Sequence, residues 1–259
     1  MLLALSPAKT LDMDGATPPL PTTLPRFIAD SARLIDILRG MAPAQLSSLM
    51  DISERLAVLN AQRYAAWSEQ FDAGNSRPAI LAFAGDVYTG LDAAHLTPAD
   101  LRWAQDHVVM LSGLYGVLRP LDLLQAYRLE MGTRLANPAG RDLYAFWGTR
   151  IAEALREQLA SHRHRLLLNL ASEEYFRAVD RAALGLPVLD IVFQEGDTGR
   201  WRVIGVHAKR ARGLMTRWII EQRIDQPEQL REFALEGYAH APEASDDARW
   251  VFRRTRGAA

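Results

Sequence analysis

The sequence predicts an α+β protein in which a mixed α/β sheet is flanked by helices. Short apolar runs alternate with amphipathic segments of helical spacing, as in folds that place helices against a sheet. Late in the chain, Gly196-Asp197-Thr198-Gly199 separates two alternating segments, which is a hairpin signal and argues against a purely parallel sheet. With 49% apolar and 24% charged residues, the 259-residue chain has an ordinary globular composition. We expect 1–259 to form a single domain, with a helical region at about 25–75.

Composition and the first residues narrow the function classes. Cysteine is absent, which excludes disulfides, thiolate catalysis and cysteine-ligated metals. The formal net charge is -1, so any surface for a polyanion must be a local patch. The opening MLLALSPAKT has no basic leader region, and its apolar run is far too short to span a membrane. We therefore expect a cytoplasmic protein without a membrane partner.

The individual elements follow from periodicity and capping residues. Apolar or alternating runs predict strands at 2–5, 79–83, 108–111, 166–170, 188–194, 201–209 and 250–252. Helical spacing and helix-start signals predict helices at about 27–39, 44–50, 54–71, 98–107, 142–162, 172–176 and 213–224.

The segment 111–132, LSGLYGVLRPLDLLQAYRLEMG, lacks a clean hydrophobic period. Its turns at Ser112-Gly113 and Arg119-Pro120 hold polar side chains away from the backbone, which is typical of a site. The polar side chains of this segment are Ser112, Tyr115, Arg119, Asp122, Tyr127, Arg128 and Glu130. We expect the segment to be the centre of the functional site.

A second candidate is the basic run from Arg200 to Arg217, which contains no acidic residue. We expect Lys209-Arg210-Ala211-Arg212-Gly213 to form a turn at a helix N-terminus, where amides and guanidinium groups together bind anions. The alternative is an exposed strand followed by a solvated loop.

Lysine is unusually scarce. Of the 30 basic residues, only Lys9 and Lys209 are lysines. A lysine differs from an arginine where a compact charge or a titratable amine is needed. Both positions are therefore candidate site residues. The alternative is that an arginine-rich composition leaves two lysines by chance.

The segment 44–60 weakly resembles a helix-hairpin-helix, in which turn amides hold a phosphate. Here Asp51-Ile52-Ser53 replaces the usual Gly-hydrophobic-Gly turn, and an ordinary helical corner is the alternative. No cofactor or metal site is predicted, because neither GxGxxG nor GxxxxGK[ST] occurs and His162-x-His164 has no carboxylate nearby in sequence.

Seven motifs, in order along the chain, resemble the bacterial YaaA peroxide-stress resistance family. They are SPAKTLD (6–12), GDVYTGL (85–91), LSGLYGVLRPLD (111–122), YRLEMG (127–132), DLYAFWG (142–148), NLASEEYF (169–176) and AKRARGLMTR (208–217). The resemblance implies a cytosolic protein, induced during hydrogen peroxide stress, that limits damage from unincorporated iron. It further implies a YaaA-type fold with a positively charged cleft and a helix-hairpin-helix element that binds DNA.

Two functional hypotheses follow. In the first, the protein binds duplex DNA largely without sequence specificity. The Ile52–Ser53 turn contacts the DNA backbone, and the cleft is lined by Lys9, Arg119, Arg128, Lys209, Arg210, Arg212 and Arg217. In the second, the same basic cleft belongs to an enzyme acting on a phosphorylated or nucleotide substrate. Its catalytic candidates are Asp122, Glu130 and Lys209. Direct iron sequestration is the least supported interpretation, and the sequence does not define an oligomeric state.

The shape of the cavity distinguishes the two hypotheses. A deep pocket containing Glu130 and Lys209 favours an enzyme, whereas an open groove about 20 Å across favours a duplex.

Overall fold

The computed structural model describes residues 1–15, 17, 19–197 and 199–255, and its main feature is an eight-stranded mixed sheet. The strand order is β11-β12-β9-β8-β1-β5-β6, and β10 pairs with β9 outside this path. The strands of the sheet are β1 (Leu2–Leu5), β5 (Val108–Ser112), β6 (Gly116–Leu118), β8 (Leu167–Leu170), β9 (Val188–Asp197), β10 (Arg200–Arg202), β11 (Ala239–His240) and β12 (Arg249–Thr255). Two small sheets pair β2 (Thr10–Leu11) with β4 (Phe83–Ala84), and β3 (Ser76–Pro78) with β7 (Leu123–Gln125).

The centre of the large sheet is parallel and its periphery antiparallel. Strand β1 lies between β5 and β8 and runs parallel to both, with Leu3 opposite Val108 and Leu168. Strands β8, β9 and β12 continue the parallel arrangement. Strands β6, β10 and β11 each pair antiparallel with their neighbours. The prediction of a mixed sheet is confirmed.

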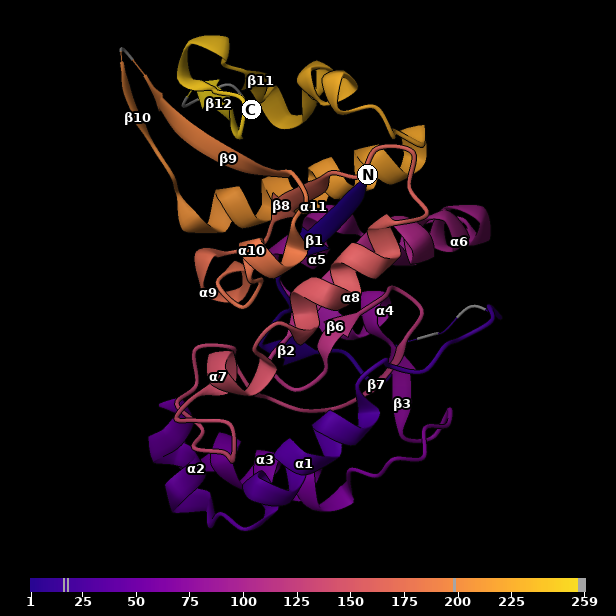
Figure 1. Cartoon of the computed structure of the whole chain (residues 1–259), viewed down its shortest axis with the longest axis vertical. Helices are drawn as coiled ribbons and strands as arrows, with labels where there is room; N and C mark the ends of the chain where they lie inside the picture. The colour runs from indigo at the N-terminus through magenta and orange to yellow at the C-terminus, as the bar shows by residue number, and fades with distance from the viewer. Residues whose placement is uncertain (16, 18, 198, 256–259) are drawn as a thin grey trace.

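Helices surround this sheet, and Figure 1 shows α1–α3 gathered at one end of the long axis, with β11 and β12 at the other. The α-helices are α1 (Ile28–Arg39), α2 (Pro43–Met50), α3 (Glu54–Ala66), α4 (Ala79–Ala82), α5 (Asp86–Leu91), α6 (Pro98–His107), α7 (Leu143–Trp147), α8 (Arg150–Leu159), α9 (Glu173–Phe176), α10 (Arg181–Leu184) and α11 (Gly205–Gln222). Short 3₁₀ helices are η1 (Ala93–His95), η2 (Pro227–Glu232), η3 (Leu235–Gly237) and η4 (Pro242–Ala244). In the part of the chain described, no helix has the length and hydropathy needed to cross a membrane.

Helices α5 and α11 pack through two glycines that allow their backbones to touch. A Cβ atom on Gly213 would lie 1.8 Å from the carbonyl oxygen of Val87, and one on Gly90 would lie 2.2 Å from that of Arg210. Because only glycine fits at such an approach, these two residues fix how α11 lies over α5. The position of every side chain on α11 depends on this contact.

Three predicted elements were wrong. Residues 79–82 form α4 rather than a strand; all four are buried and apolar, and a short apolar run does not distinguish helix from strand. The predicted helix 142–162 is two helices, because Gly148 adopts a positive φ of 50° between α7 and α8.

The third error concerns the basic run. Strand β10 ends at Arg202, and α11 begins at Gly205, well before the predicted Gly213. From Ala208, the buried residues Ala211, Met215 and Ile219 recur at helical spacing, which outweighs the alternation seen before them. The expected turn with free amides at Lys209–Gly213 is therefore the interior of a helix.

Candidate functional site

A pocket of about 420 Å³ opens at the carboxyl ends of β1 and β8. The chain leaves β1 to form β5 on one side, and later forms β8 on the other side. Such a reversal of strand order leaves a crevice between the loops after the two strands, where open α/β sheets bind ligands. A pocket of this volume suits a small molecule.

The floor of the pocket is a hydrogen-bonded junction between the two loops. Ser6 follows β1, and its Oγ lies 3.2 Å from the Oγ of Ser172 and accepts from the Ser172 amide at 2.8 Å. The buried hydroxyl of Tyr88 donates to the Ser6 carbonyl at 2.9 Å. Burial raises the pKa of Tyr88 and of Tyr175, so both hydroxyls are neutral at physiological pH. The junction holds the loops in fixed positions.

Three cationic side chains line this pocket: Lys9 from the β1 loop, and Lys209 and Arg212 from α11. The two lysines of the chain, far apart in sequence, therefore meet in one place. Lys209 and Arg212 share a face of α11 because they are three residues apart. Across the described ranges, neither has a carboxylate partner.

The burial of Arg212 makes it the most distinctive of the three. Its Nε is buried without a hydrogen-bond partner among the described residues, and burial lowers the pKa of its guanidinium group. A buried polar group without a partner costs free energy, so the position of this side chain is held by the surrounding structure. An anion in the pocket would meet this charge.

Three carboxylates line the same pocket: Asp86, Glu130 and Glu174. Glu130 bridges two cations, with Lys9 Nζ at 2.7 Å and Arg128 Nη2 at 3.0 Å. Glu174 accepts the Gly132 amide at 2.9 Å. For Asp86, half-buried at the start of α5, the described residues provide no ion-pair partner. The pocket is thus a mixed acid–base site rather than a uniformly basic one.

Arg128 lies beside the pocket in a small adjoining hollow that Lys9 and Glu130 also line. Behind it, the buried hydroxyls of Ser112 and Tyr127 lie 2.6 Å apart, and Tyr127 belongs to this hollow as well. The second half of the segment 111–132 thus contributes Glu130 to the pocket and Arg128 to its edge.

The other basic residues of the predicted cleft lie elsewhere. Arg119 lines a different hollow and pairs with buried Asp122 at 3.2 Å. Asp122 accepts from Thr23 Oγ1 at 2.5 Å and from the Arg119 amide at 2.7 Å. Its carboxylate therefore connects the segment at Thr23 to the turn at Arg119. Arg210 and Arg217 pair with Glu236 and Asp92 respectively.

Helices α2 and α3 are joined by the short turn Asp51-Ile52-Ser53. Asp51 takes the left-handed conformation at φ 50°, which the expected glycine would adopt without strain. Ile52 is buried, and the Ser53 side chain accepts the Leu56 amide at 3.4 Å as a helix cap. Neither residue lines the pocket around Lys9.

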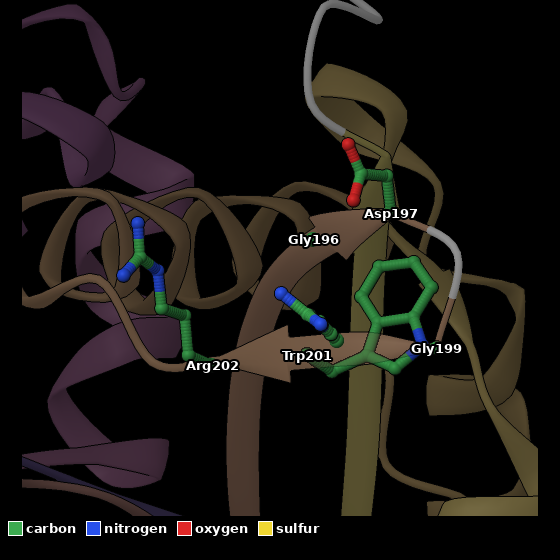
Figure 2. Close-up of a pocket in the computed structure, with 6 residues that line it drawn as sticks. Gly196, Asp197, Gly199, Trp201 and Arg202 are labelled. Atoms are coloured by element: carbon green, nitrogen blue, oxygen red, sulfur yellow. The ribbon is translucent and has the colours of Figure 1, made fainter.

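A further hollow of about 580 Å³ follows the β9–β10 hairpin and is lined by Gly196, Asp197, Gly199, Arg200, Trp201 and Arg202. Figure 2 shows Trp201 and Arg202 projecting from β10 in different directions. Residue 198, part of the predicted turn, lies outside the described residues. Arg200 and Arg202 are exposed, and one hairpin alone lines this hollow. The pocket at the carboxyl ends of β1 and β8, the switch-point pocket, is instead lined by residues from several elements.

The predicted site residues did not include several that line the pocket: Ser6, Asp86, Tyr88, Ser172, Glu174 and Tyr175. Their signal was the polar stretch directly after each apolar run, as in Ser6–Lys9 after β1. Since the carboxyl ends of neighbouring parallel strands meet at one edge, knowledge of the strand order would have joined them.

Together these features define a mixed α/β protein with a polar pocket at the switch point of a mostly parallel sheet. The chain belongs to the family described as Peroxide stress protein YaaA, whose family model matches residues 1–244. It is 58% identical over 255 residues to a UPF0246 protein of Paracidovorax citrulli, covering 98% of each chain. A UPF0246 protein of Ralstonia nicotianae is 58% identical over 256 residues, covering 98% of this chain and 99% of its own. The family description supports a role in peroxide stress.

Proposed function

We propose that, within this peroxide-stress role, the protein binds a phosphorylated small molecule or nucleotide in the switch-point pocket and acts on it as an enzyme. The observation that carries the proposal is the meeting of Lys9, Lys209 and Arg212 with Glu130 in one pocket of about 420 Å³. The enzyme hypothesis expects Glu130 and Lys209 in one pocket, and both line this one.

The distribution of charge supports an anionic ligand. Glu130 already neutralises part of the charge of Lys9, whereas Lys209 and Arg212 have no carboxylate partner in the described chain. An ammonium group and a planar guanidinium group are the two side chains that proteins use most to bind phosphate. A phosphoryl group placed between Lys209 and Arg212 would pair both.

The carboxylates of the pocket supply groups for acid–base catalysis on a bound substrate. Asp86 is half-buried and lines the pocket without an ion-pair partner in the described chain, so it is available to accept a proton from a bound substrate. Glu130 holds Lys9 and Arg128, which suits a positioning group. Asp122 lies outside this pocket, so Glu130 and Lys209 remain of the predicted catalytic candidates, and the pocket adds Asp86 to them.

Calorimetric titration with ATP, ADP, AMP and inorganic phosphate tests the proposal. At least one of these probes should bind to the wild type with one-to-one stoichiometry. Lys209→Ala should weaken binding about tenfold or more, because a hydrogen bond to a charged group contributes about 1.5–3 kcal/mol.

Arg210→Ala is the matched control, since Arg210 is the next residue on α11 but pairs with Glu236 outside the pocket. Its affinity for the probe should equal that of the wild type. The proposal fails if none of the four probes binds, or if Arg210→Ala weakens binding as much as Lys209→Ala.

We also propose binding of duplex DNA, largely without sequence specificity, on the outer surface. It is supported by the exposed arginines Arg200 and Arg202 on the β9–β10 hairpin, and by the α2–α3 helical hairpin. A two-stranded ribbon is one of the elements that the major groove admits. The further link to limiting damage by unincorporated iron rests on the resemblance of the sequence alone.

A salt series tests DNA binding. The slope of log affinity against log salt should become shallower by about 0.9 for each phosphate contact removed, so Arg200→Ala plus Arg202→Ala should change it. Lys209→Ala serves as the control, because it lies in the small-molecule pocket. An unchanged slope in the double variant rules out the hairpin as the contact.

A further inference from the structure

Two histidines and an aspartate meet at the amino ends of the central parallel strands, on the side opposite to the switch-point pocket. The side chains of His107, His162 and Asp225 each offer one ligand atom, and these atoms lie within 4.8 Å of one another. His107 directly precedes β5, and His162 lies in the loop before β8, so both are at the amino ends of the parallel strands. All three residues are half-buried.

Backbone carbonyls set the orientation of both imidazoles. His107 Nδ1 lies 2.8 Å from the carbonyl oxygen of Trp103, and His162 Nε2 lies 3.0 Å from that of Asp106. Because a carbonyl can only accept, each of these nitrogens carries the proton. The lone pairs that remain, on His107 Nε2 and His162 Nδ1, are the ones that would coordinate a metal, and such carbonyl contacts are the usual outer support of metal-binding histidines.

The cluster already surrounds a positive charge. The Met1 ammonium donates to Asp225 Oδ1 at 2.7 Å and lies 3.1 Å from His162 Nδ1. The Met1 residue is fully buried, so this charge is held by the protein rather than by bulk water. Two of the three ligand atoms thus point at one cationic centre, an arrangement that also suits a metal ion.

We propose that His107, His162 and Asp225 bind a divalent first-row transition metal. Two imidazole nitrogens and one carboxylate oxygen are ligands that suit Zn²⁺, Co²⁺, Ni²⁺ or Fe²⁺ rather than Mg²⁺ or Ca²⁺. Ligand atoms at about 2.0–2.1 Å from zinc lie about 3.4 Å apart in a tetrahedral site. Metal binding therefore requires the three ligand atoms to move about an ångström closer to one another. The metal competes with the Met1 ammonium for the same lone pairs.

The test is titration of Zn²⁺ and Co²⁺ into the full chain without a histidine tag. One equivalent of Zn²⁺ should bind, and Co²⁺ should give the intensified visible absorption of a site with imidazole ligands. His162→Gln and His107→Gln should each weaken Zn²⁺ binding about 100-fold or more, because losing even an outer support of a ligand costs about 10–100-fold.

His95→Gln is the matched control, as His95 is exposed, lies 2.7 Å from Asp92 and is not part of this cluster. Its Zn²⁺ affinity should be that of the wild type. If the histidine variants do not fold, Asp225→Asn gives the same readout from the carboxylate, and the Co²⁺ spectrum of the wild type needs no variant. An unchanged Co²⁺ spectrum, or equal loss in His95→Gln and His162→Gln, overturns the proposal.

Discussion

Glu195 shows at the scale of one residue how this arginine-rich chain uses its charges. Its buried carboxylate accepts from Tyr238 Oη at 2.7 Å and Arg254 Nη2 at 2.5 Å, and lies 2.9 Å from His207 Nδ1. Burial alone would raise the pKa of Glu195, but the hydrogen bonds from these three partners outweigh it and leave the pKa lowered. The carboxylate therefore stabilises the fold in its charged form.

Glu195→Gln should lower the free energy of unfolding at pH 7 by about 3 kcal/mol, because the largely buried Arg254 loses its closer carboxylate and keeps the longer contact with Glu236 at 3.6 Å. A lowered pKa contributes stability above the unfolded value of about 4.3, and this contribution disappears as pH falls through the folded value. The difference between wild type and variant should thus shrink below about pH 4. Urea unfolding of wild type and variant at pH 7 and below about pH 4 measures this difference in stability, with the exposed Glu243→Gln as control. A difference independent of pH would contradict this assignment.

At the scale of elements, the contact of α5 with α11 carries a second prediction. Gly213→Ala places a Cβ against the Val87 carbonyl and should destabilise the protein by about 1–3 kcal/mol. It should also weaken ligand binding, because Lys209 and Arg212 move with α11. Gly205→Ala is the control: nothing lies within 4 Å of the added Cβ, so alanine should be neutral or stabilising. Equal effects of the two variants on Tm and affinity would exclude the packing role of Gly213.

Which elements could be predicted depends on how local their determinants are. Leu2–Leu5 is a strand because four consecutive apolar residues are buried on both faces of a parallel sheet. The start of α6 is local as well, because Thr97 and Asp100 form a capping box there. By contrast, residues 79–82 are equally apolar, and only their tertiary surroundings make them helical.

Over the whole molecule, the site was harder to predict than the fold. The scarcity of lysine singled out Lys9 and Lys209, and both line the pocket. The basic run 200–217 also predicted Arg210 and Arg217 as site residues, and the sequence does not show that only Arg212 of these three lines the pocket. That difference depends on the face of α11 that each residue occupies and on distant acids such as Glu236. The metal cluster is wholly non-local, since Asp225 is far from both histidines in sequence.

The two proposed sites lie at opposite ends of β1, whose four residues span about 13 Å. Sites this far apart without shared partners should act additively on stability. A bound nucleotide at 100 times its Kd contributes about 2.7 kcal/mol, which for a chain of this size raises Tm by about 5–10 °C. Thermal unfolding with the nucleotide, with Zn²⁺ and with both should give shifts that add. Lys209→Ala should reduce only the nucleotide shift and His162→Gln only the Zn²⁺ shift, because each side chain belongs to one edge of the sheet. If either variant abolished both shifts, the two edges would form one coupled site.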